Sequence, residues 1–348
     1  MSVAARGAPR TEEELDALLS EPRDATVNAL RLAPGDIVVL GAGGKMGPTL
    51  SRMAARAARA ADGASPRRVI AVSRFTSGVT SRELERHGVE TIACDLLDAN
   101  AVARLPDAPN VIFMAGQKFG TMDAPSRTWM MNVVVPAHCA RRYAGSRIVA
   151  FSTGNVYPLV PADGGGASEA VEPRPIGEYA ASCLGRERAF EFAALEHGTR
   201  VAIVRLNYAI DLRYGVLTDL AQKILDDAIV PLAMGHVNII WQGDANRAAL
   251  ELLPLAAPQP LVVNVTGSET LSVRSLATRL AQRLGRTPRF AALEARDALL
   301  SDTARFRQLL GGADLPVDTM IEWVADWVRE GRPLLGKPTH FEARDGAY

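Results

Sequence analysis

Three glycines, spaced three residues apart, directly follow a short apolar run near the start of this chain. The run is Ile37-Val38-Val39-Leu40, the glycines are Gly41, Gly44 and Gly47, and helix-like sequence begins at Pro48. Glycine lets the backbone turn tightly and approach a phosphate, and a helix N-terminus offers unpaired N–H groups and partial positive charge. A strand, a glycine turn and a helix start in this order are typical of dinucleotide-binding folds. The glycines have the spacing G-x-x-G-x-x-G, and their position between a strand and a helix favours a dinucleotide site over a plain turn.

The composition of the chain excludes several other classes of protein. With 348 residues, of which 48% are hydrophobic and 22% charged, it can bury a sizeable core. Acidic and basic residues balance at 39 each, which argues against a nucleic-acid partner. No apolar run is long enough to span a membrane or act as a signal peptide, so we expect no membrane association. The odd, widely spaced Cys94, Cys139 and Cys183 favour a reducing cytoplasm and no bound metal.

Strand-like and helix-like segments alternate from residue 36 onward. The expected strands are 36–41, 68–73, 90–93, 109–114, 146–152 and 200–206. The expected helices between them are 48–61, 80–87, 126–143 and 178–196. This alternation predicts an α/β fold, a doubly wound parallel sheet with helices on both faces.

Helical patterns dominate after about residue 206, which predicts a smaller, mostly helical C-terminal substrate lobe. The expected helices are 216–228, 244–256, 271–284, 296–310 and 317–329. In the last of these, the spacing of Ile321, Val324 and Trp327 predicts a stripe that faces the core. We therefore divide the chain into a helical N-terminal extension (1–35), a dinucleotide-binding domain (36–206), a substrate lobe (207–330) and an irregular tail (331–348), and leave open whether the lobe interleaves with the first domain.

Several short motifs, taken in chain order, resemble those of the extended short-chain dehydrogenase/reductase family, the group of nucleotide-sugar epimerases and dehydratases. Besides the glycine loop, they are Asp95-Leu96, Met114–Lys118, Asn132, Phe151–Tyr157 and Glu178–Ser182. The resemblance covers residues 36 to about 330. It implies a Rossmann fold, an NAD(P) cofactor, a carbohydrate-like small-molecule substrate, and a homodimer formed through helices 126–143 and 178–196.

The same resemblance implies the residues of the cofactor site. They are Gly41, Gly44, Lys45, Met46, Gly47, Asp95, Leu96, Ala115, Gly116, Lys118 and Tyr179. We add Ser73 and Arg74, which end the second expected strand. NAD sites commonly place an acid there to bind the ribose 2′-hydroxyl, whereas an arginine can hold the 2′-phosphate of NADP. With no acid present, NADP is favoured over NAD, unless Arg74 stacks on adenine or faces water.

Thr153 and Tyr179 are the residues on which we place the chemistry. Thr153 ends an expected parallel strand, where doubly wound sheets hold their ligands, and Tyr179 on the next helix can give or take a proton. A free tyrosine has a pKa of about 10, so a base near neutrality needs positive charge beside it. We also expect Ser152, Asn155, Asn207 and Tyr208 to contact the substrate, or to serve as structural hydrogen-bonding groups.

The family supplies that positive charge with a lysine four residues after the tyrosine, and this chain has Cys183 there. In one interpretation, Cys183 is a small buried filler in a site that has lost this chemistry. In a second, another cation compensates: Lys118, whose family counterpart mainly binds cofactor, or Arg186, two turns beyond Tyr179. A nucleophilic Cys183 is the least favoured, because no histidine or second cysteine is placed to activate it.

Two functions from different classes remain open. The first is NAD(P)-dependent dehydrogenation, reduction or epimerisation at a hydroxyl of a sugar, sugar acid or nucleotide sugar. The second is a binding or sensor protein that keeps the nucleotide site but has lost turnover, for which Cys183 is the best evidence. The paired Thr153 and Tyr179 favour the enzyme.

Overall fold

The structure is a computed structural model that describes residues 7–118, 120, 123–291, 293–337 and 339–347. Two helices, α1 (Glu12–Leu19) and α2 (Asp24–Leu32), precede a seven-stranded parallel sheet of order β12-β7-β5-β4-β1-β2-β3. Its strands are β1 (Ile37–Leu40), β2 (Val69–Ser73), β3 (Glu90–Ala93), β4 (Asn110–Phe113), β5 (Arg147–Thr153), β7 (Arg200–Leu206) and β12 (Leu261–Val265). The predicted doubly wound α/β fold is confirmed.

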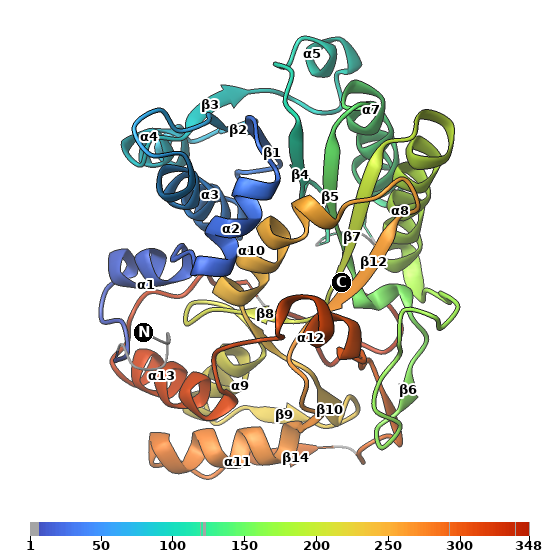
Figure 1. The fold of residues 1–348 in the computed structure, drawn as a ribbon. Coiled ribbons are helices and arrows are strands. Elements are labelled where there is room, and N and C mark those ends of the chain that lie inside the picture. The colour runs from blue at the N-terminus through green and yellow to red at the C-terminus, as the bar shows by residue number, and fades with distance from the viewer. Residues whose placement is uncertain (1–6, 119, 121–122, 292, 338, 348) are drawn as a thin grey trace.

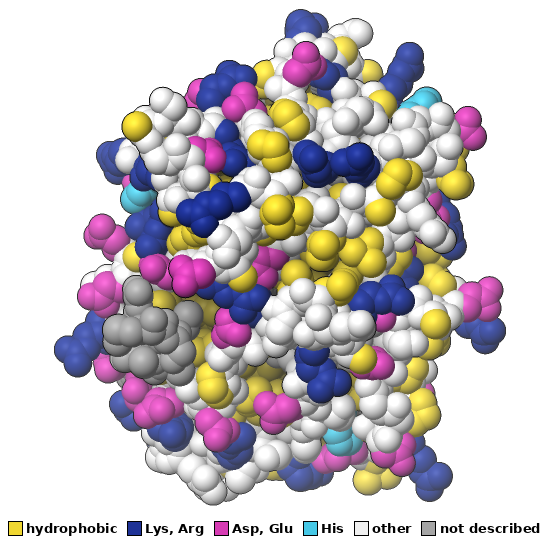
Figure 2. All heavy atoms as spheres, viewed as in Figure 1, with side chains coloured by type: hydrophobic (Ala, Val, Ile, Leu, Met, Phe, Trp, Pro, Cys, Tyr) yellow, Lys and Arg dark blue, Asp and Glu magenta, His cyan; other side chains and the backbone are white. Residues whose placement is uncertain are grey.

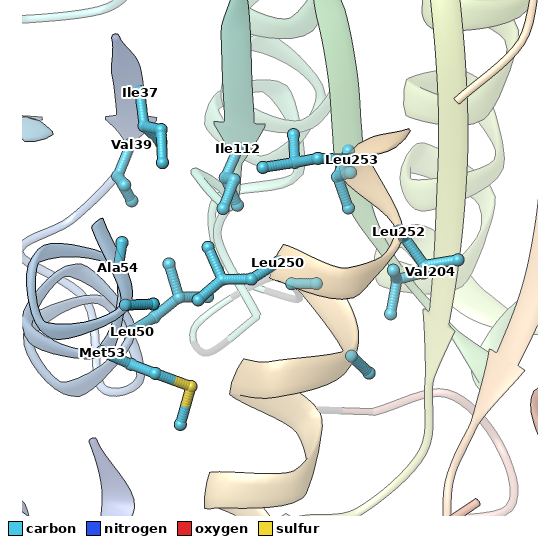
Figure 3. Packing of buried hydrophobic residues seen from close by; sticks show 14 of the residues in the cluster. Ile37, Val39, Leu50, Met53, Ala54, Ile112, Val204, Leu250, Leu252 and Leu253 are labelled. Atoms are coloured by element: carbon cyan, nitrogen blue, oxygen red, sulfur yellow. The ribbon is translucent and has the colours of Figure 1, made fainter. Parts of the chain in front are cut away.

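Helices cover both faces of the sheet because its strands are apolar on both sides. Val39 packs with α2, α3 (Gly47–Asp62) and α10 (Gln242–Glu251), while Val38 packs with α5 (Ala99–Ala103), α7 (Val135–Arg142) and α8 (Gly177–His197). Such continuous apolar strands are expected for a sheet that is buried on both faces. Figure 3 shows Ile37, Val39 and Ile112 of the sheet facing Leu50 of α3 and Leu250 of α10.

The second lobe lies beyond the carboxyl ends of the strands, below the sheet in Figure 1. Its core is formed by α9 (Val216–Leu225), α11 (Val273–Leu284) and α13 (Val317–Arg329). The predicted core stripe is confirmed, since Trp327 is only 1% exposed. The remaining elements are short: α4 (Val79–Arg86), α6 (Pro125–Trp129), α12 (Ala304–Leu310), β6 (Val160–Pro161), β8 (Ala209–Ile210), β9 (Ile229–Pro231), β10 (His236–Val237), β11 (Ile240–Trp241), β13 (Leu271–Ser272), β14 (Arg289–Ala291) and β15 (Asp297–Ala298).

Three segments differ from the sequence prediction. The sheet gains the edge strand β12, so the chain returns from the second lobe to pair with β7. The expected helix 296–310 begins only at Ala304, because β15 pairs with β6 and the apolar pair Leu299 and Leu300 packs against Met234 in an extended segment. The expected helix 126–143 contains one π-helical turn, Met130–Val134, just before Pro136, which has no N–H to continue the α-helical ladder.

Charged side chains of both signs are interspersed over the face of the molecule seen in Figure 2, without a patch of one sign. This distribution agrees with the balanced composition. Within the described ranges, the helices are all too short or too polar to cross a membrane. The tail after Arg329 is irregular, as predicted, but it is packed: Phe341 is fully buried in the core of the second lobe.

Candidate active site

A cavity of about 310 Å³ lies between the carboxyl ends of the strands and the second lobe. It brings together the glycine loop, the segments after β4, β5 and β7, the first turns of α8 and α9, and one residue of the tail. The lining residues are Gly41, Gly44, Lys45, Met46, Met114, Gly116, Gln117, Lys118, Phe151, Ser152, Thr153, Asn155, Tyr179, Arg186, Leu206, Asn207, Tyr208, Ala209, Ile210, Tyr214, Gly215, Val216 and Thr339. Ligands of doubly wound sheets bind at this edge.

The glycines of the loop serve two different needs. A Cβ on Gly41 would lie 2.5 Å from the backbone nitrogen of Ala115, and one on Gly47 would lie 2.2 Å from the carbonyl oxygen of Ala42. Backbone packing therefore requires glycine at both positions. Gly44 is different, since its Cβ would meet only the Gly41 carbonyl, at 3.4 Å, on the cavity wall. A side chain at Gly44 would occupy space that a pyrophosphate needs, so the loop fits a dinucleotide.

Asn132 on the π-helical turn holds the loop that follows β4. Its side-chain oxygen accepts hydrogen bonds from the Gln117 N–H (2.9 Å) and from Arg186 Nη2 (2.7 Å). Its amide group donates to the Gln117 carbonyl (3.0 Å) and to Ser182 Oγ (2.9 Å). A Cβ on Gly116 would lie 2.3 Å from Arg186 Nη2, so this glycine lets the loop pass close to the cavity floor.

Thr153 and Tyr179 meet in the cavity, as the motifs predict. The Thr153 hydroxyl donates to Asn155 Oδ1 (2.8 Å) and forms a hydrogen bond with the Tyr179 hydroxyl. Burial raises the pKa of Tyr179 well above its ordinary value, and the Cys183 thiol acts in the same direction. The Arg186 guanidinium and the Thr153 hydroxyl oppose this shift in pKa. This raised pKa keeps Tyr179 protonated near neutral pH.

Cys183 lies behind Tyr179 and is fully buried, outside the cavity lining. Burial raises the pKa of its thiol, against the opposing effects of Arg186, Tyr179 and Lys118. The high pKa makes a reactive thiolate unfavourable. Because the charge of Lys118 lowers the pKa of the Cys183 thiol, Lys118 lies near the position where the family carries its lysine. Burial lowers the pKa of Lys118 to about 8, although Asp219, Cys183 and Glu342 favour its charged form.

Arg186, the second candidate cation, also lines the cavity, but its guanidinium is already engaged. Besides Asn132, it donates to the carbonyl oxygen of Phe151 at 2.9 Å. Its Nε atom is buried without a hydrogen-bond partner among the described residues. Arg186 therefore provides a positive charge that is held in place by hydrogen bonds to Phe151 and Asn132, whereas Lys118 brings its charge from the loop after β4.

Lys45 points from the glycine loop toward the second lobe. Its ammonium group lies 3.9 Å from the buried carboxylate of Asp211 and 4.4 Å from the ring centroid of Tyr214. Burial lowers the pKa of Lys45 to about 8, opposed by Asp211. Arg213 links this pair to the N-terminal extension through Asp16, at 2.7 Å. The predicted cofactor residue Lys45 thus connects the loop to the second lobe.

Other predicted cofactor residues lie outside the cavity lining. Ala115 and Gly47 shape the glycine loop from behind, and Leu96 is buried in the core. Asp95 is exposed after β3, where its side chain accepts the Leu97 N–H at 3.1 Å. Arg74 is exposed at the end of β2, and a Cβ on Gly43 would lie 2.5 Å from Ser73 Oγ. The roles of Ser73, Arg74, Asp95 and Leu96 remain predictions.

The four predicted substrate residues all line the cavity, but some hydroxyl and amide groups are used within the protein. Ser152 Oγ donates to Glu187 Oε1 (2.5 Å), which is ion-paired with buried Arg205. Asn207 Nδ2 donates to the Leu299 carbonyl at 3.3 Å. These bonds fit the structural alternative for Ser152 and Asn207. Asn155 and Tyr208 are also hydrogen-bonded within the protein, to Thr153 and to the Phe341 carbonyl, so the substrate roles of all four residues remain predictions.

Sequence reasoning missed several cavity residues from the second lobe and the tail, including Tyr214, Gly215 and Thr339. For Gly215 the sequence signal is a glycine directly before an expected helix. The structure explains it, because a φ of +136° and a Cβ that would lie 2.5 Å from the Ile210 side chain require glycine at the start of α9. Thr339 lies in a segment without a periodic pattern, so no local signal identifies it.

Comparisons with known proteins assign the chain to a family. The model of the NAD dependent epimerase/dehydratase family matches residues 37–247, which include both the glycine loop and Tyr179. The chain therefore belongs to this family and is an enzyme of the class that uses a nicotinamide dinucleotide. None of the curated proteins matches the chain in sequence.

The fold is shared with solved sugar-nucleotide enzymes. MoeE5, solved with UDP-glucose and NAD, is 20% identical and superposes with a TM-score of 0.70 over 85% of this chain and 99% of its own. UDP-glucose 4-epimerase from Thermotoga maritima, solved with UDP-glucose, is 19% identical with a TM-score of 0.68 over 85% and 99%. UDP-glucuronic acid 4-epimerase from Bacillus cereus, solved with NAD, is 17% identical with a TM-score of 0.69 over 85% and 99%.

Proposed function

We propose that this enzyme oxidises, reduces or epimerises a hydroxyl-bearing carbon of a sugar-like substrate, with Tyr179 moving the proton. The observation that carries the proposal is the meeting of Tyr179, Thr153 and the glycine loop in one cavity. When bound, a nicotinamide dinucleotide supplies the hydride acceptor or donor. Tyr179 then accepts the hydroxyl proton or returns it, while Thr153 orients the same oxygen. The solved neighbours that contain UDP-sugars and NAD support this class of substrate.

We also propose that Lys118 takes the role of the family's missing lysine. The chain's Tyr179 needs positive charge because burial raises its pKa well above the ordinary value. Lys118 approaches from the loop after β4, lines the cavity and acts on Cys183, four residues after Tyr179. An ammonium group there favours the phenolate and can contact a ribose hydroxyl, the two tasks that a neutral thiol does not perform.

The cofactor preference that we propose is NADP over NAD. Arg74 is exposed at the end of β2, close to the glycine loop, and residues 73–75 contain no acid. An exposed guanidinium can bind a 2′-phosphate through two parallel hydrogen bonds. The solved neighbours contain NAD, which argues against a preference for NADP.

A cofactor-binding sensor is the second candidate function, and it is favoured by one specific observation. Tyr179 is buried and has a raised pKa, in a site without the helix lysine. Purified enzyme incubated with NAD or NADP and a panel of free sugars, sugar acids and nucleotide sugars distinguishes the two. The enzyme changes nicotinamide absorbance or the stereochemistry of one substrate, whereas a sensor binds cofactor and leaves every substrate unchanged.

The oligomeric state follows from the same family resemblance, and we propose a homodimer. The helical segments expected to form it, α6 to α8, carry the exposed apolar side chains Trp129, Met130, Phe192 and Leu195. Sedimentation of the purified protein tests this, and a monomer at micromolar concentration contradicts it.

A further inference from the structure

The C-terminal segment Thr339–Gly346 borders the cavity through Thr339 and is held by hydrogen bonds near both of its ends. At its start, the Thr339 N–H and hydroxyl donate to Asp219 Oδ2 at 2.8 and 2.5 Å. The Thr339 carbonyl accepts a hydrogen bond from Lys118 Nζ at 3.0 Å. Phe341 follows as a fully buried side chain. The segment is therefore integrated into the site and fixes the ammonium group that we assign to the chemistry.

The far end of the segment is attached to different elements. Arg344 donates to the backbone carbonyl of Asp297 at 2.9 Å and to its carboxylate at 2.5 Å. Gly346 packs against Ile176 and Gly177, where a Cβ on Gly177 would lie 2.7 Å from the Gly346 carbonyl oxygen. Gly177 begins α8, two residues before Tyr179. The segment thus links the second lobe to the helix that carries the proposed proton-transfer group.

Two non-glycine residues with left-handed backbone lie at this contact. Tyr208 has a φ of +42° and lines the cavity, and His340 has a φ of +53° next to Thr339. The Tyr208 hydroxyl donates to the carbonyl oxygen of Phe341 at 3.3 Å. Such conformations are unfavourable and persist where surrounding contacts hold them, often at ligand sites. The segment and the cavity wall are therefore fitted to each other.

The segment contributes walls to two neighbouring cavities. Thr339 lines the main cavity, while Ala343, Arg344 and Gly346 line a second one of about 20 Å³. Asn155 lines both. Asn155 therefore lies between the main cavity and the part of the segment that lines the second one.

The remaining space is small and carries little positive charge. The main cavity, at about 310 Å³, is at the lower end of the ~300–1,000 Å³ typical of sites for one drug-sized ligand, and it borders the glycine loop as well. Among the described residues, the cations that line the cavity are Lys45, Lys118 and Arg186. Each of them already forms an ion pair or a hydrogen bond with another group of the protein. Asp219 and Glu342 lie close enough to Lys118 to favour its charged form, so their negative charge offsets this lysine's attraction for a diphosphate.

We propose that Thr339–Gly346 is a built-in wall that restricts the site to a small sugar or sugar acid without a nucleotide diphosphate. This inference rests on the proposed sugar chemistry and narrows its substrate class. Asn155 and Tyr208 line the cavity on the side of this segment, and the segment closes that side to a nucleotide diphosphate. Because the wall also holds Lys118, the same segment sets substrate size and positions the cation.

The test is calorimetric titration of UDP and of UDP-glucose into the full-length protein, loaded with whichever of NADP and NAD it binds more tightly, and into a variant with a loosened segment. Asp219→Ala with Arg344→Ala removes the acceptor of Thr339 and the far anchor. The matched control is Asp326→Ala with Arg329→Ala, which removes an exposed ion pair on α13. We expect the parent and the control to bind either ligand no tighter than about 1 mM, and the loosened variant to bind UDP-glucose at least tenfold tighter.

Micromolar binding of UDP-glucose to the parent protein would overturn the inference, and so would an unchanged affinity in the folded double variant. Circular dichroism establishes folding; if the double variant does not fold, Arg344→Ala alone must give a gain of at least threefold. Failure of the proposed chemistry is separate. It shows as no hydride transfer from any sugar, free or nucleotide-linked, whereas turnover of nucleotide sugars alone contradicts only the restriction to small substrates.

Discussion

The walls at the cofactor end of the cavity are mostly backbone, whereas those at the substrate end are side chains from distant segments. Gly41, Gly44 and Gly47 lie within seven consecutive residues and directly follow β1. Lys118, Tyr179 and Thr339 come from three parts of the chain that meet only after folding. The comparison teaches that the proposed cofactor loop is encoded by a few consecutive residues, while the groups proposed for catalysis depend on how distant segments pack together.

Among substitutions that distinguish the substrate end of the cavity from the cofactor end, we expect Tyr179→Phe to have the largest effect on turnover. Tyr179→Phe removes the proton-transfer group and should lower turnover by roughly 10²- to 10⁴-fold, the usual contribution of a general acid or base. Cofactor affinity, measured by fluorescence titration, should change less than threefold. Tyr143→Phe is the matched control, since that hydroxyl bonds the Pro106 carbonyl in the core. Turnover of Tyr179→Phe within tenfold of the parent would argue against the assignment.

Within the glycine loop, two alanine substitutions should affect different properties, one cofactor binding and the other the stability of the fold. Gly44→Ala leaves the fold intact and weakens cofactor binding at least tenfold, because its Cβ enters the cavity rather than the protein. Gly47→Ala places a Cβ 2.2 Å from the Ala42 carbonyl, so it should lower the melting temperature of the apo protein. Titration and thermal unfolding of both variants test this. Equal melting temperatures would show that Gly47 is not required by packing.

A smaller effect is expected for cofactor choice at Arg74. The parent should bind NADP several-fold more tightly than NAD, and Arg74→Ala should make the two affinities equal by weakening NADP alone. Arg82→Ala, a nearby arginine on α4, is the control. A parent that binds NAD more tightly contradicts the proposed preference and implies that Arg74 faces water.

The smallest effect concerns stability and pH. Burial lowers the pKa of Lys45 and Lys118 to about 8, below their ordinary value, so the folded state binds fewer protons than the unfolded state between pH of about 8 and 10.5. The contribution of these two lysines to the free energy of unfolding should therefore increase as the pH rises across this window. Denaturant unfolding of Lys118→Met should show a shallower rise. An identical pH dependence would mean that Lys118 is solvated.

The sequence predicts those parts of the site that depend on local chain geometry. The glycine loop, Thr153 at a strand end and Tyr179 at a helix start all follow from short patterns, as do the parallel strands from β1 to β7. The cation for Tyr179 does not follow in this way. Lys118 was a candidate because its loop was expected to pass the cofactor, but its approach to Cys183 depends on how that loop packs.

Other parts of the molecule had no usable pattern. Strand β12 arrives from the second lobe and is recognised only by its pairing with β7. The segment before α12 has helical spacing of apolar residues, yet Leu299 and Leu300 are buried by Met234 in an extended conformation. Thr339 is held at the cavity by two backbone hydrogen bonds and one from its hydroxyl to Asp219, which lies 120 residues earlier in the chain. Tertiary contacts, rather than local preference, determine all three.

The most direct test of the account moves the positive charge from the loop back to the helix. Turnover is measured for Lys118→Met and for the same variant with Cys183→Lys added, each with its folding checked. We predict that Lys118→Met loses roughly 10- to 100-fold in turnover, equivalent to about 1.4 to 2.8 kcal/mol, and that Cys183→Lys restores at least tenfold of it. Full activity in Lys118→Met, or no recovery in the folded double variant, would contradict the claim that Lys118 replaces the missing lysine.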